Sequence, residues 1–295
     1  MKFSLKQVQV FQLVAELESV SEAAKQLHMS QSAASMALAQ LESQLGKELF
    51  IRQGRRMALS NWGAWLRPHA YSLLESCNTI EQGMQDMDLI SGVLRIGASQ
   101  TPAEYMVPQV ISALDRDFPH LQLKLGVENT EHVIEALLDY RYDLGIIEGH
   151  CDSSEIQRQK WCEDELVVIA GVEHPYTKMS ECSITQLGMA QWILREHGAG
   201  TREIFDIAVH EHLEQIQVHR EYEQSAVILE LVSHGRYLSC LSRRLVQPWL
   251  ERGLISILNT PALSMKRDIS FIWRRQDDDS PNRDALTRAA RKLID

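Results

Sequence analysis

Cysteine is scarce in this 295-residue chain, and its few residues are widely separated. The five cysteines are an odd number and include no Cys-x-x-Cys pair. Disulfide frameworks and zinc ribbons both depend on paired, regularly spaced cysteines. We therefore expect reduced thiols rather than either kind of cross-link.

Long apolar runs are also missing. Stretches such as 166–171 fall far short of the roughly 20 apolar residues that a membrane helix needs. Residues 1–20 alternate between polar and apolar side chains, unlike the compact apolar segment of a signal peptide. These absences predict a cytoplasmic protein without a membrane partner.

The motifs of common enzyme classes are absent as well. The sequence has no GxxxxGK[ST], HExxH or GxSxG, and no GxGxxG after an expected strand. His210 and His212 are two apart on an expected helix, where their side chains diverge, and the acids 277–279 are expected to form a solvated loop. We therefore expect no enzyme, no metal site and no cofactor.

The charge is unevenly distributed along the chain. The net charge is −10, but residues 1–67 carry eight basic and five acidic side chains, a net +3, which leaves −13 for the remainder. The length itself suggests two or three domains of about 100 to 200 residues each. A basic N-terminal unit can hold phosphates on one face, whereas the acidic remainder repels nucleic acid.

Residues 1–60 show the pattern of a helix-turn-helix. Apolar residues at helical spacing predict a helix over 5–18, Ser21 predicts the cap of a short helix over 22–27, and Ser30 predicts the cap of a longer third helix. The segment after it has a strand-like apolar run and an arginine-rich turn, which is typical of a wing. A helical hairpin that binds nothing has the same spacing and stays an alternative at this point.

Residues 21–63, SEAAKQLHMSQSAASMALAQLESQLGKELFIRQGRRMALSNWG, resemble the winged helix-turn-helix of the LysR-type transcriptional regulators. The resemblance rests on SQSAAS at the start of the third helix and on the LGxxLFxRxGRRxxLS wing. It implies sequence-specific binding to operator or promoter double-stranded DNA. The residues expected to contact DNA are Ser21, Ser30, Gln31, Ser32, Ser35, Met36, Arg52, Arg55 and Arg56.

The recognition helix departs from the family in its charge. Family members often carry Arg or Lys there, whereas no Lys or Arg occurs from Gln26 to Gly46. We therefore expect base contacts from Gln31, Ser32 and Ser35, with phosphate contacts left to the wing and to the N-terminal lysines.

A linker helix is expected over 61–89. Its apolar residues step by three and four from Trp62 to Met87, which forms one narrow seam. Such a seam favours pairing with a second copy of the chain, and the resemblance implies a homodimer or homotetramer. A helix that lies on its own domain core remains the alternative.

Residues 90–295 alternate expected strands and helices, which predicts an α/β fold with parallel sheets covered on both faces. We expect two α/β subdomains, I over about 90–162 plus 266–295 and II over about 163–265, with a ligand cleft between them. Segments such as 147–156, 161–168, 192–204 and 234–244 resemble the YeiE-like branch of the family, related to regulators of sulfur metabolism and carbon fixation. The resemblance implies a periplasmic-binding-protein-like effector domain.

Two segments of this domain suggest an anion site. Thr201 and Arg202 open a helix after a glycine-rich loop, and 99–101 directly follow an expected strand, so hydroxyls and free amides would face the cleft. By resemblance, the expected effector-binding residues are Ser99, Gln100, Thr101, Asn129, Glu148, Thr201 and Arg202. Glu148 would repel an anion unless Arg202 or a neighbouring cation neutralises it. The expected effector is a small anion such as sulfite or sulfate.

Two other functions remain open from the sequence. The family includes peroxide sensors, and Cys151 and Cys162 would form a redox switch if the loop between them folded back. Alternatively, the chain is a ligand-binding α/β protein whose N-terminal helices serve only assembly.

Overall fold

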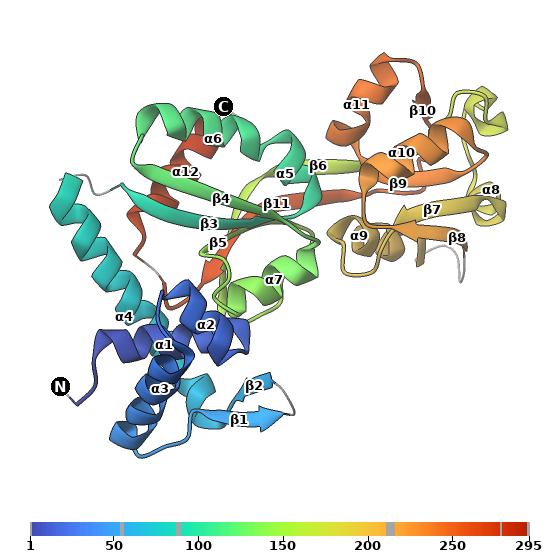
Figure 1. Ribbon diagram of the computed structural model, residues 1–295. Coiled ribbons are helices and arrows are strands. Elements are labelled where there is room, and N and C mark those ends of the chain that lie inside the picture. The colour runs from blue at the N-terminus through green and yellow to red at the C-terminus, as the bar shows by residue number, and fades with distance from the viewer. Residues whose placement is uncertain (1, 54–55, 87–89, 211–215, 278, 294–295) are drawn as a thin grey trace. The chain divides into compact units, whose positions relative to one another are not determined.

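The computed structural model describes residues 2–53, 56–86, 90–210, 216–277 and 279–293 (Figure 1). The chain divides into two compact units, one of residues 1–92 with 139–141 and one of residues 93–138 with 142–295. No helix among the described residues is both long enough and apolar enough to cross a membrane.

The described residues of the first unit form three helices, a two-stranded hairpin and one long helix. In order, its elements are α1 (Leu5–Leu17), α2 (Val20–Gln26), α3 (Gln31–Leu45), β1 (Phe50–Gln53), β2 (Arg56–Leu59) and α4 (Asn61–Asp86). Phe11, Val14 and Leu41 are among the fully buried side chains that α1 and α3 contribute to one core. The short helix supplies Ala23 and Ala24, whose small side chains let it pack closely.

The start of α2 differs from the expected one. Ser19, not Ser21, caps the helix, because its Oγ accepts a hydrogen bond from the backbone N–H of Glu22. Ser21 therefore lies inside the first turn. The third helix begins as predicted, with Oγ of Ser30 accepting from the N–H of Ala33 at 3.2 Å.

The apolar seam of α4 is divided between two environments. Ala70 is 2% exposed and packs on the core of the first unit, together with the partly buried Leu66 and Leu74. Ile80, further along the same helix, is 65% exposed. The first part of α4 therefore lies on its own core, and the side chains of the expected seam residues Met84 and Met87 lie outside the described part of the chain.

The second unit is built around one long sheet with helices on both faces. Its strands are β3 (Gly92–Ala98), β4 (Leu121–Val127), β5 (Leu144–Glu148), β6 (Ile156–Gly171), β7 (Gln191–Arg195), β8 (Gln217–Tyr222), β9 (Leu238–Ser242), β10 (Ile255–Ile257) and β11 (Lys266–Arg274). Its helices are α5 (Gln100–Tyr105), α6 (Val107–Asp117), α7 (Thr130–Leu138), α8 (Ile184–Met189), α9 (Gly200–His210), α10 (Ser225–His234), α11 (Arg243–Glu251) and α12 (Pro281–Lys292), with a 3-10 turn at Pro175–Lys178.

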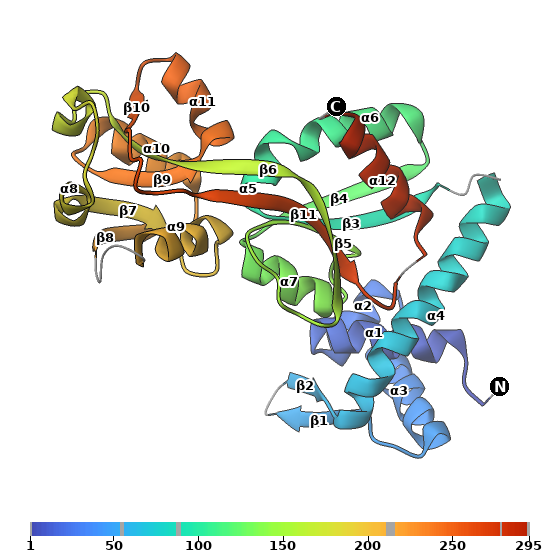
Figure 2. The ribbon, with the colours of Figure 1, turned by 180° about the vertical axis from the view of Figure 1, so that it is seen from behind.

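The strand order is β4-β3-β5-β11-β6-β9-β7-β8, with β10 also paired to β6. We call the half with β4, β3 and β5 subdomain I, and the half with β9, β7 and β8 subdomain II. Strands β6 and β11 run side by side through both halves (Figure 2). The all-parallel expectation is therefore wrong in part: β3 and β5 are parallel, as are β7, β8 and β9, but β6 and β11 are antiparallel to their neighbours.

The core of subdomain II follows the alternation of side chains along its strands. Val167 and Ile169 face α10 and α11, whereas Leu166 and Val168 face α8 and α9. Trp192 from β7 and Phe205 from α9 join the second of these clusters, with ring centroids 4.8 Å apart. Both faces of the sheet are thus buried, as the continuous apolar strands predicted.

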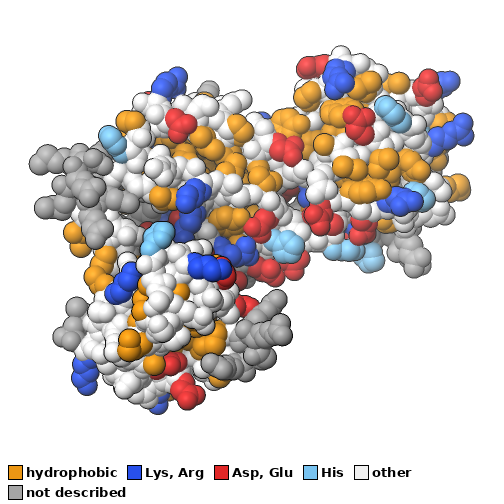
Figure 3. Space-filling model, viewed as in Figure 1, with side chains coloured by type: hydrophobic (Ala, Val, Ile, Leu, Met, Phe, Trp, Pro, Cys, Tyr) orange, Lys and Arg blue, Asp and Glu red, His pale blue; other side chains and the backbone are white. Residues whose placement is uncertain are grey.

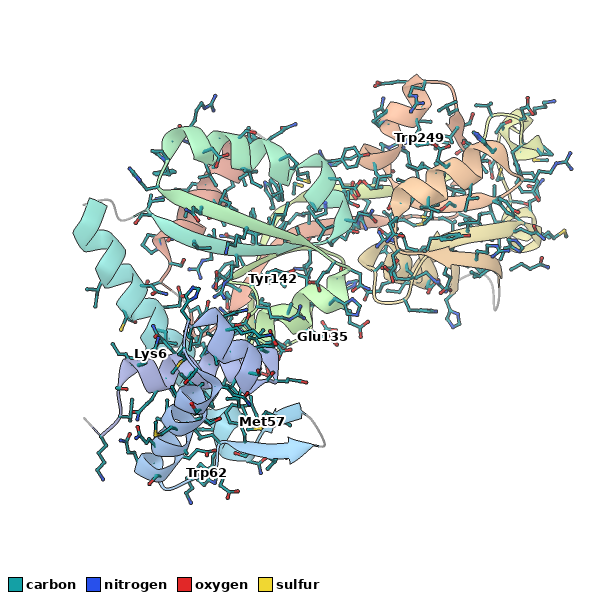
Figure 4. The ribbon with its side chains drawn as sticks, in the orientation of Figure 1. Lys6, Met57, Trp62, Glu135, Tyr142 and Trp249 are labelled. Atoms are coloured by element: carbon teal, nitrogen blue, oxygen red, sulfur yellow. The ribbon has the colours of Figure 1, made fainter. Side chains whose placement is uncertain are left out.

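Subdomain I accommodates a large ring against its sheet. Tyr142, labelled in Figure 4, lies over Gly97 of β3 and Gly126 of β4, where a Cβ atom would collide with the ring. Its hydroxyl donates to Oε1 of Glu128 at 2.6 Å. These two glycines therefore have a packing role in the sheet.

The segment after β3 forms two helices, α5 and α6. α5 already begins at Gln100, because Ser99 occupies the N-cap position and Pro102 lies in the first turn, where its missing N–H costs nothing. The break before α6 lies at Met106. Pro108 explains it, since proline has no N–H to continue the helical hydrogen bonding.

Candidate functional site

The recognition surface of the first unit is polar and uncharged. His28 adopts the left-handed conformation (φ 52°) in the turn between α2 and α3. Beyond this turn, Gln31, Ser32 and Ser35 are exposed on the first two turns of α3, and Met36 beside them is 59% exposed. The helix therefore presents the side chains that we expected to meet base edges, and their contact with DNA stays a prediction.

The wing is a hairpin of β1 and β2, with Phe50 paired to Leu59 and Gln53 paired to Arg56. This agrees with the strand-turn-strand expected from the sequence. Arg55 lies outside the described residues, and so do the side chains of Arg52 and Arg56. Their predicted phosphate contacts remain predictions.

In the second unit, a buried arginine at the start of β11 connects the two subdomains. The side chain of Arg267 is 0% exposed. Its guanidinium donates from Nη2 to Oγ1 of Thr101 at 3.2 Å and from Nη1 to Oγ1 of Thr201 at 2.8 Å. Thr101 lies in the first turn of α5 and Thr201 in the first turn of α9. One side chain thus links two helix starts from opposite subdomains.

Two buried carboxylates surround the same guanidinium. Asp164 on β6 accepts from Nε of Arg267 at 2.8 Å and from Oγ of Ser242 at 2.8 Å. Glu148, at the end of β5, has Oε1 at 3.3 Å from Nη1 of Arg267 and accepts at the same oxygen from Oγ1 of Thr201 at 3.1 Å. Both carboxylate side chains are 1% exposed. We call Thr101, Glu148, Asp164, Thr201 and Arg267 the Arg267 cluster.

A second polar link joins the subdomains near the first. Gln100, from the first turn of α5, accepts at Oε1 from both the backbone N–H and the Oγ of Ser225, at 3.2 and 3.0 Å. Ser225 is the first residue of α10, so an amide oxygen from subdomain I occupies a helix N-terminus of subdomain II. The Nε2 of Gln100 donates to Glu104 at 2.7 Å.

Ser99 and Asn129 lie at neighbouring helix starts but outside the Arg267 cluster. Ser99 makes no side-chain cap for α5, and its Oγ donates to the carbonyl of Ile146 at 3.4 Å. Asn129 accepts at Oδ1 from the N–H of His132 at 2.9 Å, which satisfies the start of α7. Both side chains are therefore buried with local partners.

Arg202 does not neutralise Glu148, which corrects one expectation from the sequence. Its guanidinium binds Asp206 at 2.9 Å and Glu221 at 2.6 Å, within subdomain II. Burial opposes its charge, but the hydrogen bonds that Arg202 donates to Glu221 and Asp206 outweigh this and raise the pKa of Arg202. The cation that pairs with Glu148 is Arg267.

A cavity of about 260 Å³ adjoins the Arg267 cluster. Its walls come from both subdomains and include Arg267 itself, Gly149 and Ile204. The remaining lining residues are charged or titratable: His150, Arg158, Glu163, Lys266 and Asp268. Thr101 and Thr201 are not among its lining residues, and their hydroxyls bind the guanidinium.

The proposed redox pair is not joined in the structure, where Cys151 and Cys162 are both free thiols. Cys151 packs against the cluster that includes Ile156, whereas Cys162 lies six residues further along the extended strand β6. Burial also raises the pKa of both thiols, which disfavours the reactive thiolate.

Sequence reasoning missed Arg267, Asp164 and Ser225. Arg267 and Asp164 face each other across the antiparallel pair β6 and β11, which no local pattern revealed. One signal was present: Arg267 directly precedes the strand-like segment 268–272, where an unpaired buried charge would be costly. Among the described residues, no group of His, Cys, Asp and Glu side chains is arranged to hold a metal ion.

Comparison with known proteins agrees with this architecture. Residues 5–64 match the bacterial regulatory helix-turn-helix family of LysR proteins, and residues 88–295 match the LysR substrate binding domain. The chain is 39% identical over 295 residues to the uncharacterized HTH-type transcriptional regulator YeiE of Escherichia coli K12, and the match covers 100% of this chain and 97% of that protein.

Solved structures share the fold at lower sequence identity. A full-length OxyR variant from Pseudomonas aeruginosa superposes with a TM-score of 0.78 at 21% identity, over 99% of this chain and 95% of that one. The regulatory domain of CcmR from Synechocystis, in complex with 2-PG, gives 0.64 at 23% identity, over 69% of this chain and 97% of that one. From its helix-turn-helix to its effector-binding domain, the chain belongs to the LysR family of DNA-binding transcriptional regulators, and it resembles the YeiE branch.

Proposed function

We propose that a small anion controls this LysR-type regulator by binding beside Thr101, Thr201 and Arg267. A sulfur oxyanion such as sulfite or sulfate is the expected class. A guanidinium, two hydroxyls and the N-terminal end of the 11-residue helix α9 meet at this place. Each of these groups can stabilise an anion, either through its positive charge or by donating a hydrogen bond to it.

The observation that carries the proposal is the buried link from Arg267 to both subdomains. An anion that takes over the hydrogen bonds of either threonine changes what holds α5 and α9 together. Binding can shift a conformational equilibrium only through such a difference in affinity between two arrangements. The complex of the CcmR regulatory domain with 2-PG supports a small ligand in a domain of this fold.

Thermal unfolding of the full-length protein with a panel of small anions tests the effector site. A ligand at a hundred times its dissociation constant adds about 2.7 kcal/mol to the state that binds it, which raises Tm by several degrees. We expect one class of anion to do so, and Thr201→Ala to abolish the shift. Thr185→Ala, an exposed threonine of α8, is the control and should keep it. An undiminished shift in Thr201→Ala would place the anion elsewhere.

We also propose that Gln31, Ser32, Ser35 and Met36 read base edges, with Arg52, Arg55 and Arg56 on phosphates. The exposure of the first four on α3 supports this. In this proposal the regulator acts as a homodimer or homotetramer, because one winged helix makes few contacts and two copies read two half-sites. The exposed Ile80 on α4 supports pairing through the linker helix.

Replacing Gln31 with Ala is expected to relax sequence preference on DNA. A side chain that bonds a base edge contributes about 1–3 kcal/mol of discrimination, so one operator position should become tolerant while non-specific affinity and its salt dependence persist. Competition binding with single-base operator variants measures this. Gln44→Ala, exposed near the far end of α3, is the control. A uniform loss of affinity for all sequences in Gln31→Ala would show a phosphate contact instead.

A further inference from the structure

Glu148 has one carboxylate oxygen in use and one without a partner. Oε1 accepts from Thr201 and lies beside Arg267, whereas Oε2 is buried and has no hydrogen-bond partner among the described residues. The side chain is 1% exposed, so bulk water does not satisfy this oxygen. A buried acceptor left unbonded is costly, and a carboxylate oxygen can bond only with a donor.

The charge around the site is not that of a simple anion trap. Within the Arg267 cluster, one guanidinium faces two carboxylates, Glu148 and Asp164. Figure 3 shows further acidic and histidine side chains gathered over α9 on the face in view. A fully deprotonated oxyanion would add negative charge beside these carboxylates and would bring no donor for Oε2.

We propose that Glu148 selects an oxyanion that still carries a proton, such as hydrogen phosphate or hydrogen sulfite, and rejects sulfate. The inference rests on the proposed effector site and narrows its ligand class. The ligand's O–H donates to Oε2 of Glu148, while its charged oxygens accept from the first-turn N–H groups of α9, which have no helical partners. Sulfate has the same tetrahedral shape but no hydrogen to donate, so its oxygens would face a carboxylate.

The division of donors at the site supports this orientation. The single hydroxyl proton of Thr201 goes to Oε1 of Glu148, and the Thr201 oxygen accepts from Arg267. This fixes Glu148 as an acceptor with its second oxygen open to a donor. The neighbouring Gly200 lies so close to the Glu148 carbonyl that a Cβ would collide with it, which brings the start of α9 directly against the end of β5.

Calorimetric titration of the full-length protein with inorganic phosphate and with sulfate is the direct test. Phosphate retains at least one proton throughout the neutral range, whereas sulfate retains none. We expect phosphate to bind at least about 100-fold more tightly, the order of discrimination found where a site is built to bond a hydroxyl that the competitor lacks. Sulfite loses its proton near neutrality, so its apparent affinity should fall as the pH rises.

Glu148→Gln converts the acceptor at Oε2 into an amide donor with nearly the same shape. We expect this variant to bind sulfate and to reduce the preference for phosphate at least tenfold. Glu230→Gln, an exposed carboxylate of α10, is the control and should leave the preference unchanged. The comparison of phosphate with sulfate uses the unaltered protein. It therefore tests the role of Glu148 even if the Glu148→Gln variant does not fold.

The outcomes separate the two proposals. Equal binding of phosphate and sulfate, both lost in Thr201→Ala, would keep the effector site and overturn the role of Glu148. Binding that survives Thr201→Ala would overturn the site itself. Failure of phosphate, sulfate and sulfite alike to bind would overturn both, as would selective binding of an amine.

Discussion

Replacing Arg267 with Met is expected to lower the free energy of unfolding by about 3–5 kcal/mol. The substitution keeps much of the side-chain length but removes the cation that lies 3.3 Å from the carboxylate of Glu148. Asp164 keeps its bond from Ser242 and a more distant approach from Arg244 at 3.8 Å. Two carboxylates that are each 1% exposed would then lie close together without their shared cation. Urea unfolding monitored by circular dichroism measures the loss.

Arg243→Met is the matched control for this experiment. Arg243 pairs with Glu165 at 2.7 Å, but both side chains are about half exposed. Exposed pairs of this kind contribute about 0–1 kcal/mol, so Arg243→Met should unfold close to the unaltered protein. A second comparison uses Arg267→Met combined with Glu148→Gln, which removes one uncompensated charge and should recover part of the loss. If Arg267→Met is as stable as Arg243→Met, the buried ion cluster does not contribute to the free energy of unfolding.

The first unit was largely predictable because its signals are local. Helical periodicity placed the three helices, and Ser30 caps α3 as expected. The error at α2 concerns two serines two residues apart, Ser19 and Ser21, either of which precedes an acid in the first turn. Cap geometry decides between such neighbours, and sequence spacing does not.

The long strand β6 was not predictable in the same way. The apolar residues at its C-terminal end are typical of a strand. The strand begins earlier, at Ile156, and residues 157–160 are polar or charged. Those residues are extended because they pair with β11, far along the chain, as in Arg158 opposite Ile272. Strand pairing at that separation is invisible to any local window, and it also sets the antiparallel centre of the sheet.

The Arg267 cluster shows the same division. Thr101 and Thr201 were predicted because a helix start after a strand is a local pattern, and the structure brings both hydroxyls to one guanidinium. Their partner Arg267 lies 166 residues from Thr101 and 66 residues from Thr201 along the chain. The sequence therefore indicated the two helix starts that meet, while the identity of the cation between them depended on the fold.

Replacing Gly200 with Ala is expected to weaken anion binding by about 10- to 100-fold while the protein stays folded. A Cβ at Gly200 would collide with the backbone carbonyl of Glu148 and would lie 3.1 Å from Oγ1 of Thr130. A carbonyl cannot rotate away as a side chain does, so the two subdomains must separate locally. Overpacking of this kind costs about 1–3 kcal/mol. This cost would destabilise the closed arrangement that binds the ligand, and the affinity would fall accordingly. Each subdomain keeps its own hydrophobic clusters and should remain folded.

Gly253→Ala distinguishes this collision from a general effect of substituting glycine. Gly253 has a positive φ of 67° but nothing within 4 Å of a Cβ. Its replacement should cost about 1–2 kcal/mol of stability through backbone strain and leave anion affinity unchanged. Gly200→Ala should show the reverse, a small change in unfolding with a large change in binding measured by calorimetry. Tighter binding in Gly200→Ala would mean that the effector favours the separated arrangement of the subdomains. Unaltered binding would contradict a role for the contact between Glu148 and Gly200 in effector binding.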